Sequence, residues 1–230
     1  MQRLPSSSLD AAQRYLFLHH YLFRLPISRL GHMTNTSKVA ITYTSESSKE
    51  SVKSLVAEIG RLKNGSAAIS IQCDLRDLES PKKIVQETQN AFGAHIDILV
   101  NNAGTEQVKL LQDITLEDYN SVMDLNLRAP VFMIQAVLPH LRAPGRIINI
   151  SNVGARCSFA KLTIYSASKA ALEGLTRSLA AEIGDKGHTV NAVEPGPVKS
   201  DMFDRYAPFL FPSLPFVSDS LGVWYWRRRG

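Results

Sequence analysis

A tyrosine and a lysine lie four residues apart in the stretch "YSASK", at Tyr165 and Lys169. On a helix, residues i and i+4 project from the same face, so the lysine ammonium can lie near the phenol oxygen. A phenol with a pKa of about 10 is a poor acid or base near neutrality, but a cation within about 4 to 6 Å favours its ionised form. The spacing therefore predicts a general acid/base, although such pairs also occur by chance on helices that have no catalytic role.

Short apolar runs alternate with longer helical patterns from Lys38 onward, which is typical of a parallel sheet covered by helices on both faces. The predicted strands are 38–43, 67–75, 96–104, 145–151 and 188–196, and the predicted helices are 48–62, 78–93, 115–141 and 165–184. Gly184 is placed to end the last helix, whose apolar stripe is formed by Leu172, Leu175, Leu179 and Ile183. The pattern predicts an α/β fold with a Rossmann-like, doubly wound parallel sheet.

Polar residues and glycines follow most of the predicted strands. In an open parallel sheet, ligands bind beyond the carboxyl ends of the strands, and the residues at these positions are Thr44 and Ser45, Asp74, Asn102–Gly104, Ser151 and Asn152, and Pro195–Ser200. These residues are candidates for ligand binding, while the alternative is that they are only helix caps and turn residues.

Four sequence blocks carry a family resemblance. In their order and distances, "NNAG" (101–104), "DLN" (124–126), "YSASK" (165–169) and "PGPVKS" (195–200) resemble the short-chain dehydrogenase/reductase family, nearest to its ketoacyl-carrier-protein-reductase-like branch. The resemblance extends from about Lys38 to Met202 and implies hydride transfer between a nicotinamide cofactor and a ketone or secondary alcohol. It also implies that Tyr165 protonates the carbonyl, that Lys169 lowers the phenol pKa and holds the ribose, and that Asn126 anchors a water in the proton relay.

The resemblance implies a cofactor track along the same edge of the sheet, with adenine beside Asp74 and the nicotinamide carboxamide at Val198 and Ser200. An Asp or Glu after the second family strand would bind the ribose of NAD, whereas Thr44 and Ser45 stand here, so NADP is favoured over NAD. The implied cofactor-binding residues are Thr44, Ser45, Asp74, Leu75, Asn102, Ala103, Gly104, Tyr165, Lys169, Pro195, Gly196, Val198 and Ser200. No metal site is predicted.

Asn152 departs from the family pattern, because it lies thirteen residues before Tyr165, where the family places the serine that orients the substrate carbonyl. Its amide can donate a hydrogen bond, although the group is longer and differently aimed than a serine hydroxyl. Ser151 is offset by one residue, which on a strand points its side chain to the opposite face. Ser151 is therefore not expected to replace the missing serine.

The first family strand and its TGxxxGxG turn are not recognisable, because only Gly31 precedes Gly60. That turn supplies backbone N–H groups to the cofactor pyrophosphate, and losing about three such bonds would weaken binding by about 4 to 9 kcal/mol. The vacant central position in the sheet must be filled. The stretch 14–23 could pair there as a strand, but a helix over 9–25 with Asp10 as its N-cap is favoured.

The segment after Met202 has three prolines and no strand or helix periodicity. The expected organisation is therefore an atypical N-terminal segment (1–37), a Rossmann-like domain (38–202) and an irregular tail (203–230), with the first and last family strands not recognisable. The substrate pocket cannot be inferred from this tail.

Composition narrows the class of protein further. A content of 44% hydrophobic and 20% charged residues is typical of a soluble globular chain, and no apolar run reaches the roughly 18 residues of a membrane-spanning helix. Two cysteines without CxxC spacing favour a reducing, cytoplasmic compartment, while the Arg-rich first 33 residues leave an organelle transit peptide open. The net charge of +5 is scattered over the chain, so a nucleic-acid partner is a minor hypothesis.

Two functions follow from these observations. The first is an NADP(H)-dependent oxidoreductase acting on a small-molecule carbonyl or alcohol, with a homo-oligomer left open and with no membrane partner. The alternative is a truncated, catalytically impaired relative with a binding role or no enzymatic role, which the missing glycine turn and Asn152 favour.

Overall fold

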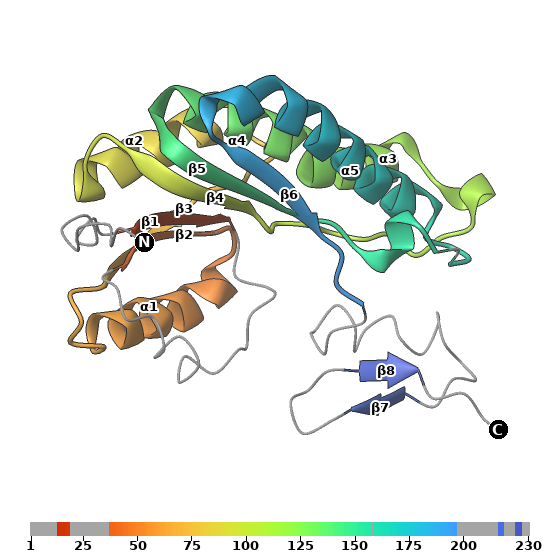
Figure 1. Ribbon diagram of the computed structural model, residues 1–230. Coiled ribbons are helices and arrows are strands. Elements are labelled where there is room, and N and C mark those ends of the chain that lie inside the picture. Colours follow the sequence, from red (N-terminus) through yellow and green to blue (C-terminus); the bar gives the residue numbers. More distant parts are fainter. Residues whose placement is uncertain (1–12, 19–36, 158, 197–215, 219–223, 227–230) are drawn as a thin grey trace.

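The computed structural model describes residues 13–18, 37–157, 159–196, 216–218 and 224–226 of the 230-residue chain. Its centre is a six-stranded sheet of order β3-β2-β1-β4-β5-β6, in which all neighbouring strands pair parallel (Figure 1). The strands are β1 (Gln13–Leu18), β2 (Ser37–Tyr43), β3 (Ala67–Gln72), β4 (Ile96–Asn101), β5 (Leu141–Ile150) and β6 (Thr189–Val193). This order reverses direction between β1 and β4, the kind of switch point at which doubly wound sheets bind ligands.

Strand β1 fills the central position of the sheet. Leu16 stands opposite Ala40 of β2 on one side and opposite Leu99 of β4 on the other. The favoured helix over this stretch is therefore wrong for 13–18, and the strand alternative is confirmed. The reason is that the facing edges of β2 and β4 each need hydrogen-bond partners, which a strand provides to both and a helix to neither. Residues 19–36, where the glycine turn would fall, lie outside the described residues.

Helices cover both faces of the sheet, as predicted. They are α1 (Glu46–Gly60), α2 (Ser80–Phe92), α3 (Leu116–Met123), α4 (Ala129–Val137) and α5 (Thr163–Ile183). Figure 1 shows α1 on one side and α2, α4 and α5 on the other. Helix α5 ends at Ile183 with Gly184 as its C-cap, as the sequence predicts.

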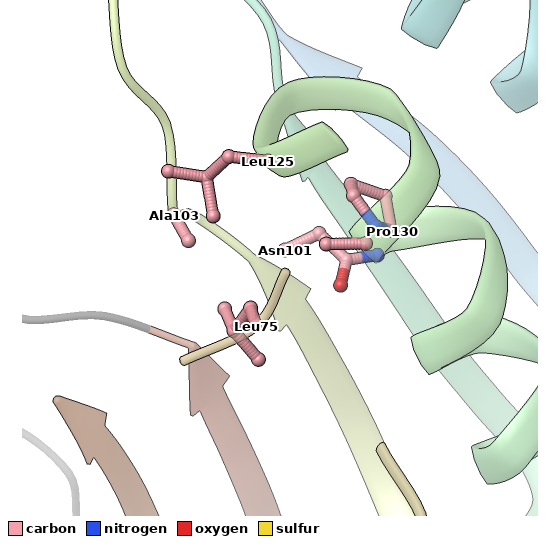
Figure 2. Close-up of a pocket in the computed structure, with 6 residues that line it drawn as sticks. Leu75, Asn101, Ala103, Leu125 and Pro130 are labelled. Atoms are coloured by element: carbon pink, nitrogen blue, oxygen red, sulfur yellow. The ribbon is translucent and has the colours of Figure 1, made fainter. Parts of the chain in front are cut away.

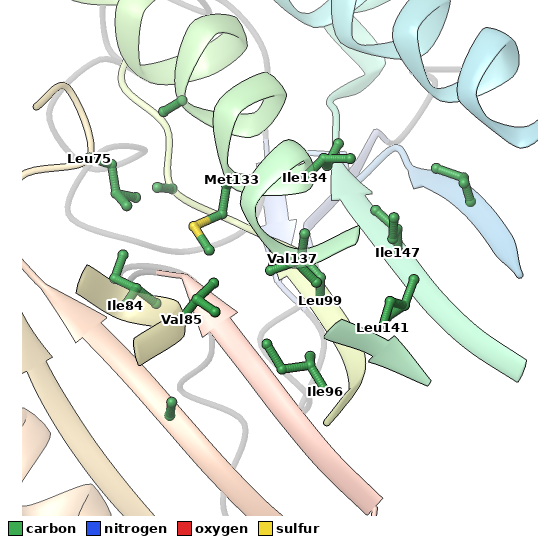
Figure 3. Packing of buried hydrophobic residues seen from close by; sticks show 14 of the residues in the cluster. Leu75, Ile84, Val85, Ile96, Leu99, Met133, Ile134, Val137, Leu141 and Ile147 are labelled. Atoms are coloured by element: carbon green, nitrogen blue, oxygen red, sulfur yellow. The ribbon is translucent and has the colours of Figure 1, made fainter. Parts of the chain in front are cut away.

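Two apolar clusters hold these layers together. The larger one packs α2, α4 and α5 on the sheet (Figure 3) and includes Leu99, Met133 and Ile147, which are completely buried. The smaller one joins α1 to β2 through Val52 and Ile41. Residues of β2 alternate between the two clusters, because successive side chains of a strand point to opposite faces. One face of the sheet, and the part of the other face formed by β2 and β3, are thereby removed from water, whereas Val193 of β6 is 46% exposed.

The stretch 115–141, predicted as one long helix, is divided in the structure. Helix α3 begins with a capping box between Thr115 and Asp118, and a π-helical turn from Asp124 to Arg128 separates it from α4. Leu141 already belongs to β5. Insertion of one extra residue per turn redirects side chains, and π-helical turns often occur at functional sites. The turn contains the predicted site residue Asn126.

The C-terminal tail contains two short strands, β7 (Phe216–Ser218) and β8 (Trp224–Trp226), which pair antiparallel in a separate sheet. The expectation of a tail without strands is therefore wrong for these six residues. Within the described part of the chain, no helix is long and apolar enough to cross a membrane. The three-part division of the chain at residues 37 and 202 stays a prediction.

Candidate active site

The structure places Tyr165 and Lys169 on one face of α5, one turn apart and near the carboxyl end of β5. Their side chains are buried, with 7% and 4% of the residue surface exposed. Lys169 Nζ lies 5.9 Å from the centroid of the tyrosine ring and donates a 2.8 Å hydrogen bond to the carbonyl of Ile150, the last residue of β5. The lysine thus ties the helix to the end of the strand.

Burial sets the protonation of both groups. It raises the pKa of Tyr165 above its usual value, and the nearby carboxylate of Glu106 adds to the rise. It lowers the pKa of Lys169 to about 8, because desolvation disfavours the charged form. In the chain itself the phenol pKa therefore moves opposite to the direction that the family resemblance implies. A phenol that keeps its proton at neutral pH suits a proton donor rather than a base.

Asn126 is completely buried and connects three segments. Its Oδ1 accepts a 2.8 Å hydrogen bond from the backbone N–H of Thr105, and its Nδ2 donates to the Thr105 carbonyl at 2.8 Å and to Ser168 Oγ at 3.0 Å. Ser168 Oγ in turn donates to the carbonyl of Tyr165. Asn126 therefore fixes the loop after β4 and the first turn of α5 relative to each other.

Gly104 has no side chain, and this leaves room for Lys169 Nζ and Asn126 Oδ1 on the same side of its backbone. A Cβ at this position would lie 3.3 Å from Lys169 Nζ and 3.4 Å from Asn126 Oδ1, which is closer than most side-chain contacts allow. The three predicted blocks that contain Gly104, Asn126 and Lys169 are thus brought together at one point, although 65 residues separate Gly104 from Lys169 in the chain.

Asn152 and Ser151 point in different directions, as expected. Ser151 is buried and donates to Glu173 Oε1 of α5 at 2.8 Å. Asn152 Oδ1 accepts from the N–H of Gly154 at 2.7 Å, and its Nδ2 donates to the carbonyl of Pro195 at 3.3 Å. The asparagine therefore bridges the ends of β5 and β6, and one of its two amide hydrogens is not needed for the Pro195 contact.

The adenosine half of the predicted track lies at the ends of β2 and β3. Thr44 Oγ1 donates to the carbonyl of Cys73 at 3.2 Å. Ser45 is the N-cap of α1, and its hydroxyl hydrogen-bonds Ser48 Oγ at 3.0 Å. The carboxylate of Asp74 is paired with Arg76 at 2.9 Å, so it is engaged by a neighbouring side chain.

A small pocket opens between Leu75, Asn101 and Ala103 (Figure 2); its other lining residues are Leu125, Ala129 and Pro130. Asn101 Nδ2 donates to Asn149 Oδ1, but the buried Asn101 Oδ1 accepts no hydrogen bond from the described residues. The pocket has room for about one water molecule. It lies beside the predicted cofactor track but does not by itself hold an adenine ring.

The structure describes some of the remaining predicted residues but not all of them. Asn102 is buried beside Ala103 and Gly104 at the end of β4, and Pro195 and Gly196 follow β6. Val198 and Ser200 lie outside the described residues. No individual role was predicted for Ser168, Asn101 or Glu173. A run of buried polar residues at a strand end and on one helix face is a signal for them, but it becomes visible only once burial is known.

A parallel sheet of this strand order, with polar side chains gathered beyond its carboxyl ends, defines the dinucleotide-binding class of α/β proteins. Residues 33–209 match the family model described as short chain dehydrogenase. The chain belongs to the short-chain dehydrogenase family of oxidoreductases.

Named dehydrogenases and reductases are similar to this chain in sequence. The chain is 48% identical over 173 residues to "Dehydrogenase OXI1" of Cochliobolus heterostrophus, covering 75% of each protein. It is 42% identical over 178 residues to "Hydroxynaphthalene reductase arp2" of Aspergillus fumigatus, covering 75% of this chain and 63% of that protein.

Solved structures are similar as well. A short chain dehydrogenase from Burkholderia cenocepacia J2315 in complex with NADP is 37% identical, with a TM-score of 0.76 over 84% of this chain and 78% of the other. A dehydrogenase/reductase from Sinorhizobium meliloti 1021 is 36% identical, with a TM-score of 0.75 over 85% of this chain and 76% of the other.

Proposed function

We propose that this chain catalyses hydride transfer between NADP(H) and a ketone or secondary alcohol, with Tyr165 as the proton donor. The observation that carries the proposal is the convergence of Lys169 Nζ and Asn126 Oδ1 over Gly104, directly beside the buried Tyr165. This convergence assembles an acid, a cation and an amide at the edge of the sheet where such folds bind their ligands.

Each residue has a role that its environment supports. When bound, the nicotinamide supplies the hydride. The neutral phenol of Tyr165 donates the proton to the carbonyl oxygen, and the ammonium of Lys169 stabilises the phenolate that remains. The spare N–H of Asn152 holds the carbonyl oxygen in place of the family serine. Asn126 keeps the loop after β4 and the start of α5 in register through Thr105 and Ser168.

The choice of NADP rests on two observations. Thr44 and Ser45, rather than an acid, directly follow β2. The first acid, Glu46, begins α1 and is paired with Lys49 at 2.9 Å. Two of the similar structures are in complex with NADPH or NADP. We place Leu75 and Ala103 along the adenosine half of the cofactor, and Val198 and Ser200 at the nicotinamide. For substrate, hydroxynaphthalenes and related hydroxylated aromatic ketones are the first class to test, since several relatives are named hydroxynaphthalene reductases.

Two measurements test the proposal, first NADPH binding and then turnover. Calorimetric titration with NADPH should give a dissociation constant in the micromolar range, and NADPH oxidation should depend on an added ketone. Tyr165→Phe should lower kcat by at least about a hundredfold, because general acid catalysis supplies about that much, while leaving NADPH affinity within about twofold. Equal turnover of Tyr165→Phe and the unchanged protein would refute the catalytic role of the tyrosine.

Absence of NADPH binding would instead favour the alternative, a catalytically impaired relative. The sequence between β1 and β2 has Gly31 as its only glycine, and this feature is the reason to measure binding before turnover.

A further inference from the structure

Glu173 is a carboxylate buried within α5 that the proposed chemistry does not use. It follows Lys169 by four residues on the same face of the helix, and 5% of its surface is exposed. Oε1 accepts the 2.8 Å hydrogen bond from Ser151, and Oε2 accepts a 3.2 Å hydrogen bond from Arg156 Nε. Because a buried charge without a partner is strongly destabilising, the arginine serves as the charge partner of this carboxylate.

Arg156 carries the connection to a third element. Its Nη2 lies 2.9 Å from Oε1 of Glu194, the residue directly after β6. The next residue, Pro195, accepts at its carbonyl the hydrogen bonds of Asn152 Nδ2 at 3.3 Å and of the Val153 backbone N–H at 3.2 Å. A closed set of contacts therefore runs from α5 through the turn after β5 to the end of β6 and back to Asn152.

Stability alone does not account for this arrangement. The Arg156 side chain is 64% exposed and that of Glu194 28%, so their pair lies in solvent, where such pairs contribute little. Buried charged groups of this kind are often no better for stability than apolar residues of the same size. What the contacts do supply is orientation, because they restrain the turn that carries Asn152 from two sides.

We propose that Glu173 and Arg156 are a pair of positioning residues that hold the Asn152 amide in the orientation for the substrate carbonyl; this inference rests on the proposed function. Glu173 anchors the pair to α5 one turn beyond Lys169, so the proton donor and the carbonyl-holding amide are set by the same helix. Without the pair, Asn152 keeps its own contacts but the turn that carries it is free to shift relative to Tyr165.

The test is a double-mutant cycle with Glu173→Gln, Arg156→Gln and Asn152→Ala. Glutamine at 173 keeps an acceptor for Ser151 but presents an N–H group to Arg156. Each single positioning variant should lower kcat/KM for the ketone by about tenfold or more, since small misplacements reduce rates strongly, with NADPH affinity unchanged. In the Asn152→Ala background, Glu173→Gln should have no further effect, because Glu173 acts through Asn152.

Glu182→Gln is the matched control, since Glu182 is exposed on the same helix and its change should leave kcat/KM within twofold. If Glu173→Gln does not fold, Arg156→Gln takes its place. Arg156 lies at the surface, so its replacement should not unfold the protein. An equal loss of kcat/KM in both Asn152 backgrounds, or a loss confined to NADPH affinity, overturns the proposal.

A readout independent of turnover separates this proposal from the proposed function. Hydrogen exchange at the Val153 and Gly154 amides, which bond to Pro195 and to Asn152, should be at least about fivefold faster in Glu173→Gln and unchanged in Glu182→Gln. If the unchanged protein shows no NADPH turnover, the proposed function fails, and exchange still decides whether the pair orders the turn. Unchanged exchange in Glu173→Gln overturns the positioning role.

Discussion

At the scale of single residues, the site is dominated by the burial of Lys169. Among the described residues, its ammonium donates to one acceptor, the Ile150 carbonyl, and the desolvation that lowers its pKa to about 8 also opposes folding. A chain selected for stability alone would place an apolar residue here. The proposed reaction gives a reason for a lysine at this buried position.

Replacing Lys169 with methionine should stabilise the fold while abolishing turnover. The unfolded lysine keeps its proton up to a pKa near 10.5, while the folded one releases it near 8. A shift of this size corresponds to a penalty of about 3 kcal/mol at pH 7, and losing the Ile150 hydrogen bond offsets about 1 kcal/mol of the gain. We expect Lys169→Met to raise the free energy of unfolding by about 2 kcal/mol.

The lowered pKa of Lys169 also fixes how the stabilisation by Lys169→Met changes with pH. Between pH 8 and 10.5 the unfolded protein binds more protons than the folded one, so the stability of the unchanged protein rises with pH and the advantage of methionine shrinks. Urea unfolding at several pH values measures this. Lys186→Met, at an exposed position, is the control, and a Lys169→Met gain that stays constant to pH 10 would contradict the prediction.

At the scale of elements, the π-helical turn between α3 and α4 decides where Asn126 points. The sequence predicts helical periodicity over 115–141, and it singles out Asn126 through the block "DLN". Periodicity could not reveal the turn, because apolar residues before and after it both face the core, as Val122 and Met133 do. The side chain of Asn126 reaches Thr105 only through this interruption of the regular helix.

Asn126→Ala should be strongly destabilising for this reason. It leaves the N–H and carbonyl of Thr105 and the hydroxyl of Ser168 without the partner that they have now. Each buried group left without a partner costs about 1 to 3 kcal/mol, so we expect the free energy of unfolding in chemical denaturation to fall by at least about 3 kcal/mol. Asn120→Ala, exposed on α3, should change stability by less than about 0.5 kcal/mol; a similar small effect at Asn126 would disprove its connecting role.

At the scale of the whole molecule, β1 makes the sheet continuous. Its backbone pairs with β2 from Gln13 to Leu18 and with β4 from Tyr15 to Leu18. Removing this strand would separate the sheet into two halves and expose two facing strand edges at its centre. Residues 13–18, which carry no recognisable family motif, are thus an integral part of the fold.

Leu16→Pro should therefore unfold the domain. Proline has no backbone N–H and is not tolerated in a strand paired on both sides, so we expect a loss of at least about 3 kcal/mol. Leu16→Ile keeps the N–H and is the matched control. Circular dichroism and thermal unfolding measure the difference, and a Leu16→Pro protein as stable as Leu16→Ile would show that β1 is dispensable.

Periodicity and residue spacing, which are local properties of the chain, were enough to predict the parallel α/β class and the pair Tyr165 and Lys169. Asn126 became a candidate through the family resemblance of its block. The sequence also separated Ser151 from Asn152, since alternation along a strand is local as well.

Only the tertiary structure decided that 13–18 is a strand, because its conformation is set by two partner edges far away in sequence. It likewise decided that burial raises the pKa of Tyr165 and that Glu173 lies against Ser151 and Arg156. Burial and long-range hydrogen bonds depend on which segments meet in space, and no single stretch of sequence contains that information.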